Sequence, residues 1–197
     1  MFYHSNSRIN GTGRSLGMKT TVAVLDKKDD NATAAVIQVL KSLDIEHSES
    51  FRILTPPTVA MEKDADALQR QNATPPIVVG YALSKLLSHN RQQHLRLKDA
   101  TIVFDGRIYS PTPRVSASEI IAKKLQADRG EASEALLKEV EGDFAFLIAE
   151  PERIIVGRDP IGVQPLYYGE NTTIAALASN RKVLWKLGIE KTHSFPP

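Results

Sequence analysis

Few residues of this chain have the type and spacing that chemistry requires, and most of those stand beside turn formers. Arg158 and Asp159 are adjacent and oppositely charged, and Pro160 and Gly162 behind them favour a turn. We therefore predict a structural role for the pair, either an internal ion pair or a clamp on a turn, in preference to a catalytic one. Asp105 could act as an acid–base group, but because a glycine follows it, the position is more typical of a turn.

The choice of nucleophile is restricted because the whole sequence contains no cysteine. Disulfides, thiolate metal sites and cysteine nucleophiles are thereby excluded. Threonine can serve instead when it is the first residue of a processed chain, so Thr20 would qualify if the chain were cut directly before it. We interpret Lys19 as an ordinary lysine and not as a Schiff-base residue. The histidines lie in polar surroundings without metal-ligand spacing, so we predict no metal site.

Composition indicates an ordinary globular domain. The chain has 197 residues, of which 42% are hydrophobic and 24% charged, enough for one domain with a sizeable core. A formal net charge of +2 gives no electrostatic reason to expect a nucleic-acid or membrane partner. Residues 1–17 are polar and lack the apolar run of a signal peptide, so we expect a flexible extension and a cytoplasmic protein.

The elements that would position these residues are mostly strands. Short apolar or β-branched runs predict strands over 19–25, 51–54, 77–81, 100–104, 144–149, 153–156, 166–168 and 173–177. Capping signals and helical periodicity predict helices from Asn31 or Thr33 to Leu43, Ser116 to Leu125, Ser133 to Glu141 and Ser179 to Leu187, the last stopped by Gly188. Asp105-Gly106 predicts a hairpin turn, and we expect loops over the proline-rich 55–76 and the basic 89–98. Hairpins followed by paired helices indicate antiparallel sheets with helices outside them.

Three segments carry a family resemblance. They are Phe104-Asp-Gly-Arg-Ile-Tyr109, Glu141-Gly-Asp-Phe-Ala-Phe146 and Gly157-Arg-Asp-Pro-Ile-Gly-Val-Gln-Pro-Leu-Tyr-Tyr-Gly169, the last followed by Ala178-Ser179. In order and spacing they resemble the class II glutamine amidotransferases, most closely the asparagine synthetase branch. The 13-residue third segment is the most specific of the three, and residues 46–76 match poorly.

This resemblance implies an α+β fold of the N-terminal-nucleophile hydrolase type, a four-layer αββα sandwich of two antiparallel sheets. It implies an amidotransferase-like domain over 18–197 and, after it, a synthetase domain that the sequence does not contain. Ser194-Phe-Pro-Pro197 resembles the point where one domain passes into the other. Arg158, Asp159, Pro160 and Gly162 become part of the family's structural motif.

The same resemblance implies that the glutamine site is degenerate. The position of the family's nucleophilic cysteine holds Lys19, and the arginine that pairs with the substrate carboxylate is missing from Gly80-Tyr-Ala-Leu-Ser84. The family's oxyanion Asn-Gly turn reads Asp105-Gly106, and the aspartate that binds the substrate amine is replaced by Ala117. The vestigial pocket would comprise Lys19, Thr20, Leu83, Asp105, Gly106 and Ala117.

Three functions follow as hypotheses. The first is a domain that does not hydrolyse glutamine and serves a structural or regulatory role for a fused ATP-dependent, amide-forming domain. The second is a remodelled hydrolase that uses Thr20 after processing, and the third is a module that binds another ligand or a partner chain. We expect no cofactor in this domain, with ATP and Mg²⁺ confined to the missing synthetase domain, and since relatives often dimerise, a homodimer is an open expectation.

Overall fold

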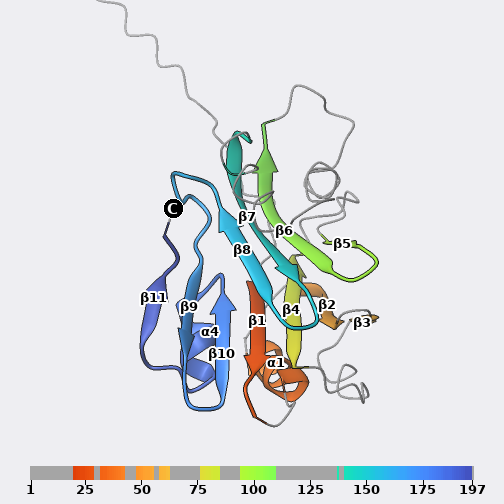
Figure 1. Ribbon diagram of the computed structural model, residues 1–197, viewed down its shortest axis with the longest axis vertical. Coiled ribbons are helices and arrows are strands. Elements are labelled where there is room, and N and C mark those ends of the chain that lie inside the picture. The colour runs from red at the N-terminus through yellow and green to blue at the C-terminus, as the bar shows by residue number, and fades with distance from the viewer. Residues whose placement is uncertain are drawn as a thin grey trace, which may run out of the picture.

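The computed structural model of the chain describes residues 20–28, 32–42, 48–55, 58–62, 76–84, 94–109, 137 and 140–196. These residues form two antiparallel sheets (Figure 1). The larger sheet has the order β11-β9-β10-β1-β4-β2-β3, with β1 Thr20–Asp26, β2 Ser48–Thr55, β3 Thr58–Glu62, β4 Ile77–Ser84, β9 Tyr167–Glu170, β10 Ile174–Ala178 and β11 Thr192–Ser194. The smaller sheet has the order β5-β6-β7-β8, with β5 His94–Arg96, β6 Thr101–Ile108, β7 Gly142–Ala149 and β8 Ile154–Arg158. Two helices are described, α1 Ala32–Ser42 and α4 Arg181–Lys186.

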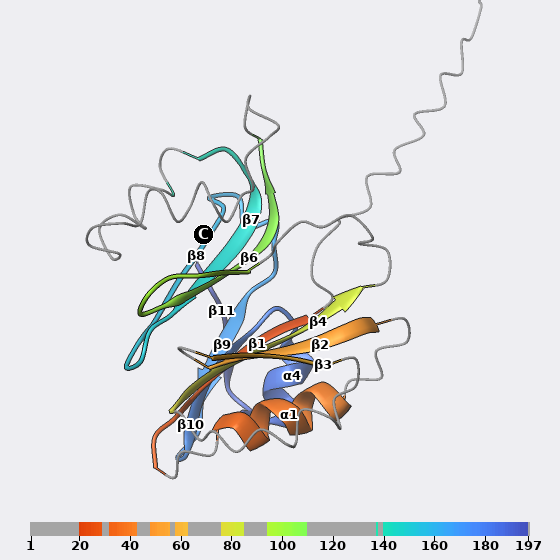
Figure 2. The same ribbon diagram turned by 90° about the vertical axis from the view of Figure 1, so that its right-hand side faces the viewer.

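The sheets are stacked, and each face of the larger sheet has its own core. Figure 2 shows α1 and α4 on one side of that sheet and the smaller sheet on the other. Successive residues of a strand point to opposite faces: Val22 and Val24 of β1 pack in the helix-side cluster, whereas Ala23 packs in the cluster between the sheets. The predicted α+β fold with two stacked antiparallel sheets is thus confirmed.

The outer face of the smaller sheet is also apolar. Phe104, Phe144 and Phe146 form its cluster, and Leu137 and Val140 pack against them. Strands β6 and β7 are therefore buried on both of their faces, the one toward the larger sheet and the outer one. The helices predicted over 116–125 and 133–141 as the fourth layer lie outside the described residues, apart from positions such as Leu137.

The predicted hairpin turn at Asp105-Gly106 is wrong. Both residues lie inside β6, where Asp105 pairs with Ala145 and Gly106 with Phe144. Gly106 has a φ of 115°, and a Cβ there would lie 2.0 Å from the carbonyl oxygen of Asp143. The glycine is required because the strand bends and approaches β7 closely, a role that glycine fills inside strands as well as in turns.

The predicted loops at 55–76 and 89–98 are wrong in part. Residues 58–62 form β3, which pairs with β2, and residues 94–96 form β5, which pairs with β6. The short β11 likewise pairs with β9 along residues that we did not predict as a strand. All three are edge strands, which form hydrogen bonds along one side only and tolerate polar, irregular sequences.

The last helix begins one residue later than predicted. Asn180 is its N-cap, and the Asn180 side chain accepts a hydrogen bond from the backbone N–H of Lys182 at 3.0 Å. Ser179 instead turns toward β1, where its Oγ accepts from the backbone N–H of Thr21 at 3.0 Å. Gly188 ends the helix with a φ of 71°, as predicted.

A polar cluster links the larger sheet to β5, an edge strand of the smaller sheet. Arg52 of β2 and Tyr81 of β4 both reach His94 of β5: the Tyr81 hydroxyl lies 2.7 Å and the Arg52 Nη1 3.0 Å from His94 Nδ1. Because arginine can only donate, Nδ1 must be unprotonated and accept. Burial, and then the charge of Arg52, lower the pKa of His94, and both disfavour protonation of the ring.

Candidate functional site

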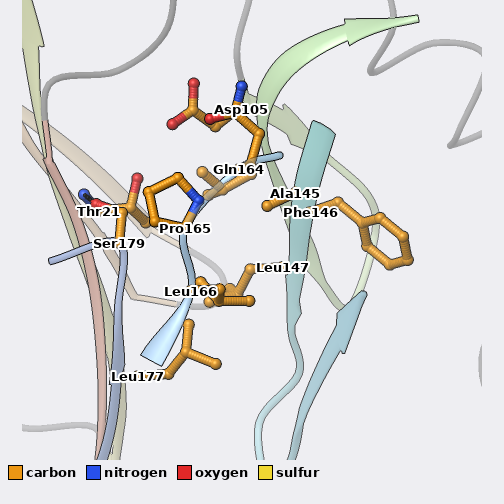
Figure 3. A pocket seen from close by; sticks show the side chains of 11 residues that line it. Thr21, Asp105, Ala145, Phe146, Leu147, Gln164, Pro165, Leu166, Leu177 and Ser179 are labelled. Atoms are coloured by element: carbon orange, nitrogen blue, oxygen red, sulfur yellow. Dashed lines mark hydrogen bonds between the residues drawn. The ribbon is translucent and has the colours of Figure 1, made fainter. Parts of the chain in front are cut away.

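A small, partly open pocket with a cavity volume of about 20 Å³ lies between the two sheets. The larger sheet contributes Thr21, Leu177 and Ser179, and the smaller sheet contributes residues of β6 and β7, among them Asp105. The segment Gln164–Leu166, which connects the sheets, forms a third wall (Figure 3). The floor is apolar, and the polar groups gather at Thr21, Asp105, Gln164 and Ser179.

The start of β1 presents Thr21, and not Thr20, to this pocket. Thr21 is a lining residue, with 7% of its surface exposed, and Ser179 lies beside it (Figure 3). The pleat places Thr20 on the opposite face, the one that carries Val22 and Val24 against α1. Processing before Thr20, as the second hypothesis requires, would therefore present its hydroxyl to the helix layer and not to the pocket.

Asp105 brings a carboxylate to the pocket wall. Its side chain lies above Gln164 in Figure 3 and is partly buried. An ionised carboxylate has only acceptor oxygens. At this position of the wall the ionised side chain therefore offers an oxyanion no hydrogen-bond donor. Among the residues that the structure describes, no group of three or more His, Cys, Asp or Glu side chains could hold a metal ion.

The Arg158-Asp159 segment shapes the third wall. Asp159 has no exposed surface, and its carboxylate accepts from the backbone N–H groups of Val163 at 3.0 Å and Gln164 at 3.3 Å. Arg158 Nη1 donates to the carbonyl oxygen of Gln164 at 3.4 Å. Gly162 has a φ of 71°, and a Cβ there would lie 2.7 Å from the Arg158 guanidinium. The two charged side chains thus fix a turn, which is the clamp alternative of our prediction.

The other predicted site residues are only partly placed. Lys19 and Ala117 lie outside the described residues, and Leu83 is described only as part of the backbone of β4, where it pairs with Ser50 of β2. Asp105 lies in the pocket wall and Gly106 follows it in β6. Sequence reasoning did not single out Gln164 or Ser179 as pocket residues, although both stand in or directly behind the third family segment.

An α+β sandwich of two antiparallel sheets, with a pocket between them at the start of the central β1, defines the class of N-terminal-nucleophile amidotransferase folds. The chain matches the glutamine amidotransferase domain family over residues 82–186, just over half of its length, and it belongs to that family. The matched range includes Asp105, the 157–169 segment and Ser179. None of the helices within the described residues is long and apolar enough to cross a bilayer.

A protein that is similar in sequence relates the domain to asparagine synthetase. Over 56 residues the chain is 43% identical to a protein of Methanocaldococcus jannaschii that carries the provisional name asparagine synthetase 1 (glutamine-hydrolyzing); the match covers 27% of this chain and 10% of that protein. The chain is also similar to the solved structure of glutamine phosphoribosylpyrophosphate amidotransferase from B. subtilis in complex with ADP and GMP, with a TM-score of 0.69 and 17% identity over 90% of this chain and 45% of that one.

A second solved structure, described as the allosteric regulatory enzyme of purine biosynthesis, gives a TM-score of 0.71 at 15% identity, again over 90% of this chain and 45% of the other. The chain thus spans less than half the length of the proteins it matches. At these identities the two structures support the fold, and the sequence match relates the domain to asparagine synthetase.

Proposed function

We propose that this amidotransferase-type domain does not release ammonia from glutamine and that it serves a structural or regulatory role for an ATP-dependent, amide-forming domain. That domain would be fused to it or associated with it, and it would take the ATP and Mg²⁺. Membership of the glutamine amidotransferase domain family itself rests on the match over residues 82–186.

The observation that carries the proposal is the carboxylate of Asp105 in the pocket wall. Attack on an amide generates an oxyanion, which hydrolases stabilise with hydrogen-bond donors, each contributing roughly 2.7–4 kcal/mol, or about 10²–10³ in rate. A carboxylate offers no donor and adds repulsion. The sequence also lacks cysteine, so the thiol nucleophile is missing and the side chain at position 105 cannot act as an oxyanion donor.

The family resemblance adds two further losses. They are the partners of the substrate's carboxylate and amine, lost at Leu83 and Ala117, and Lys19 stands at the position of the missing nucleophile. The groups that support the framework are retained, since the Asp159 clamp and the Gly106 approach are intact. Retention of the fold with loss of the chemistry is what a role in assembly or regulation would require.

A second candidate is a hydrolase with a threonine nucleophile. As the nucleophile, Thr21 is better placed than the predicted Thr20, because Thr21 lines the pocket beside Ser179 and Asp105. Cleavage before Thr21 would give its hydroxyl and a free amine at the same residue, and the amine, with a pKa near 8, could act as a base. The carboxylate of Asp105 still opposes the developing oxyanion, so this candidate ranks second.

The test is a glutaminase assay on the purified protein together with the mass of its intact N-terminus. We expect no ammonia release above buffer and no cleavage before Thr20 or Thr21. A glutamine-hydrolysing relative assayed in parallel shows that the conditions support the reaction. Ammonia release by a chain that begins at Thr21 would establish the second candidate, and release by an uncut chain would refute both.

A further inference from the structure

Apolar side chains that face solvent gather around the turn after β8. The described residues expose five large apolar or aromatic side chains. Ile161 and Val163 are 85% and 53% exposed at the tip of the turn. Tyr109, 63% exposed, lies near its base: the Tyr109 backbone N–H donates to the carbonyl oxygen of Glu141, and that of Asp159 donates to the carbonyl oxygen of Phe144, each at 2.8 Å. We call Tyr109, Ile161 and Val163 the loop patch.

The loop patch is held rigidly. The Asp159 carboxylate binds the N–H groups of residues 163 and 164, and the Gly162 N–H donates to the Asp159 carbonyl oxygen at 2.9 Å. Isolated exposed apolar residues are normal on proteins. A fixed turn that presents Ile161 at 85% exposure differs, because it can bury that side chain in a partner at little cost in conformational entropy.

The chain's last described residues lie at the same end of the molecule. The backbone N–H of Phe195 donates to the carbonyl oxygen of Leu166 at 2.8 Å, directly after the turn, and Figures 1 and 2 both show the described end near the β8–β9 connection. Tyr168 and His193 face each other there across β9 and β11, with ring centroids 5.4 Å apart. A domain that followed in the same chain would be tethered beside the loop patch.

We propose that the loop patch is the docking surface for the ATP-dependent domain. This inference rests on the proposed function and names the surface through which the role would be exerted. The matched part is 45% of each of the two solved structures, so each of those two proteins carries a further part of comparable size. An apolar, preformed turn next to the tether point fits a permanent partner better than a transient one.

Because these 197 residues contain no cysteine, an introduced thiol is the only one in this domain. Val163→Cys is placed in the full-length protein, or in the complex with the separate ATP-dependent domain, and labelled with a short photo-crosslinker. Trp185→Cys, on α4 and 53% exposed, is the matched control. We expect Val163→Cys to crosslink to peptides of the ATP-dependent domain and Trp185→Cys not to.

The outcomes separate the hypotheses. Crosslinks from Val163→Cys to a second copy of this chain, to an unrelated protein or to nothing would overturn the docking proposal. As an independent check, Ile161→Asp should weaken association at least about tenfold while Trp185→Asp leaves it unchanged, because a buried isoleucine side chain contributes at least that much. Glutaminase activity in the same preparation would overturn the proposed function but not the assignment of the surface.

Discussion

Removing the Asp159 carboxylate should destabilise the domain more than any other single loss of charge in the third family segment. The side chain is fully buried, and it is the acceptor for two backbone N–H groups, those of Val163 and Gln164. In Asp159→Ala both donors lose their partner inside the fold. The turn that lines the pocket and presents the loop patch would then lose its clamp.

The magnitude follows from the two contacts. A hydrogen bond to a charged group contributes about 1.5–3 kcal/mol, and an unsatisfied buried donor costs about 1–3 kcal/mol. The variant also no longer buries a charge, which offsets part of the loss. We therefore expect Asp159→Ala to lower the free energy of unfolding by about 2–4 kcal/mol, or the melting temperature by roughly 4–16 °C for a domain of this size.

Urea unfolding monitored by fluorescence measures this loss. Trp185, the single tryptophan of the chain, lies in α4 and is 53% exposed, so its emission is complemented by far-UV circular dichroism, which follows the loss of both sheets. Glu152→Ala removes a charge of the same sign from the exposed β7–β8 connection and should change stability by less than about 0.5 kcal/mol. An Asp159→Ala variant within that same margin of the wild type would refute the clamp.

Three further perturbations test the packing, the sheet contact and the pocket. Gly80→Ala places a Cβ 2.3 Å from Val36 Cγ1 of α1, so overpacking should lower the free energy of unfolding by about 1–3 kcal/mol in urea titrations, and an unchanged midpoint would contradict the tight contact. Burial and then Arg52 lower the pKa of His94 in the folded state, so below a pH of about 6.5 the unfolded state binds a proton that the folded state does not. The free energy of unfolding should therefore fall as the pH is lowered from about 6.5 to the folded-state pKa. A His94→Gln variant whose urea midpoint depends equally steeply on pH would contradict this. Asp105→Asn restores an oxyanion donor but no thiol, so the ammonia assay should still show no glutaminase activity; ammonia production would place a nucleophile elsewhere in the pocket.

Elements with a strong internal pattern were predictable from the sequence, whereas those defined by their neighbours were not. Helix α1 could be predicted because Val36, Ile37 and Leu40 repeat on one face, and all three are buried. The pair Asp105-Gly106 has the same local composition in a turn as in a bent strand, and only the pairing with β7 decides between them. The edge strands β3 and β5 were missed for the related reason that each is short and is defined by its pairing with a neighbouring strand.

The candidate site was predictable where chemistry is tied to one residue, and not where it depends on how the sheets stack. The absence of cysteine could be read directly, whereas the family resemblance placed Asp105 at the pocket and its own sequence context wrongly suggested a turn. The choice between Thr20 and Thr21 depends on which face of β1 meets the smaller sheet, and the pocket roles of Gln164 and Ser179 depend on the turn and the α4 entry. Strand alternation, counted from the buried Ala23, would have indicated Thr21.

The turn after β8 connects the two proposals, because one short segment serves both the pocket and the surface. Gln164 lines the pocket while its N–H and carbonyl group bind Asp159 and Arg158, and Ile161, three residues earlier, faces solvent. A partner that docks on Ile161 therefore contacts a segment whose other end is the pocket wall, and any displacement of the turn must alter both. If the domain regulates an ATP-dependent partner, a ligand in the pocket and the partner on the loop patch should change each other's affinity by the same factor. Equal affinities of the ligand for the domain with and without the bound partner would show that the turn does not couple the two sites.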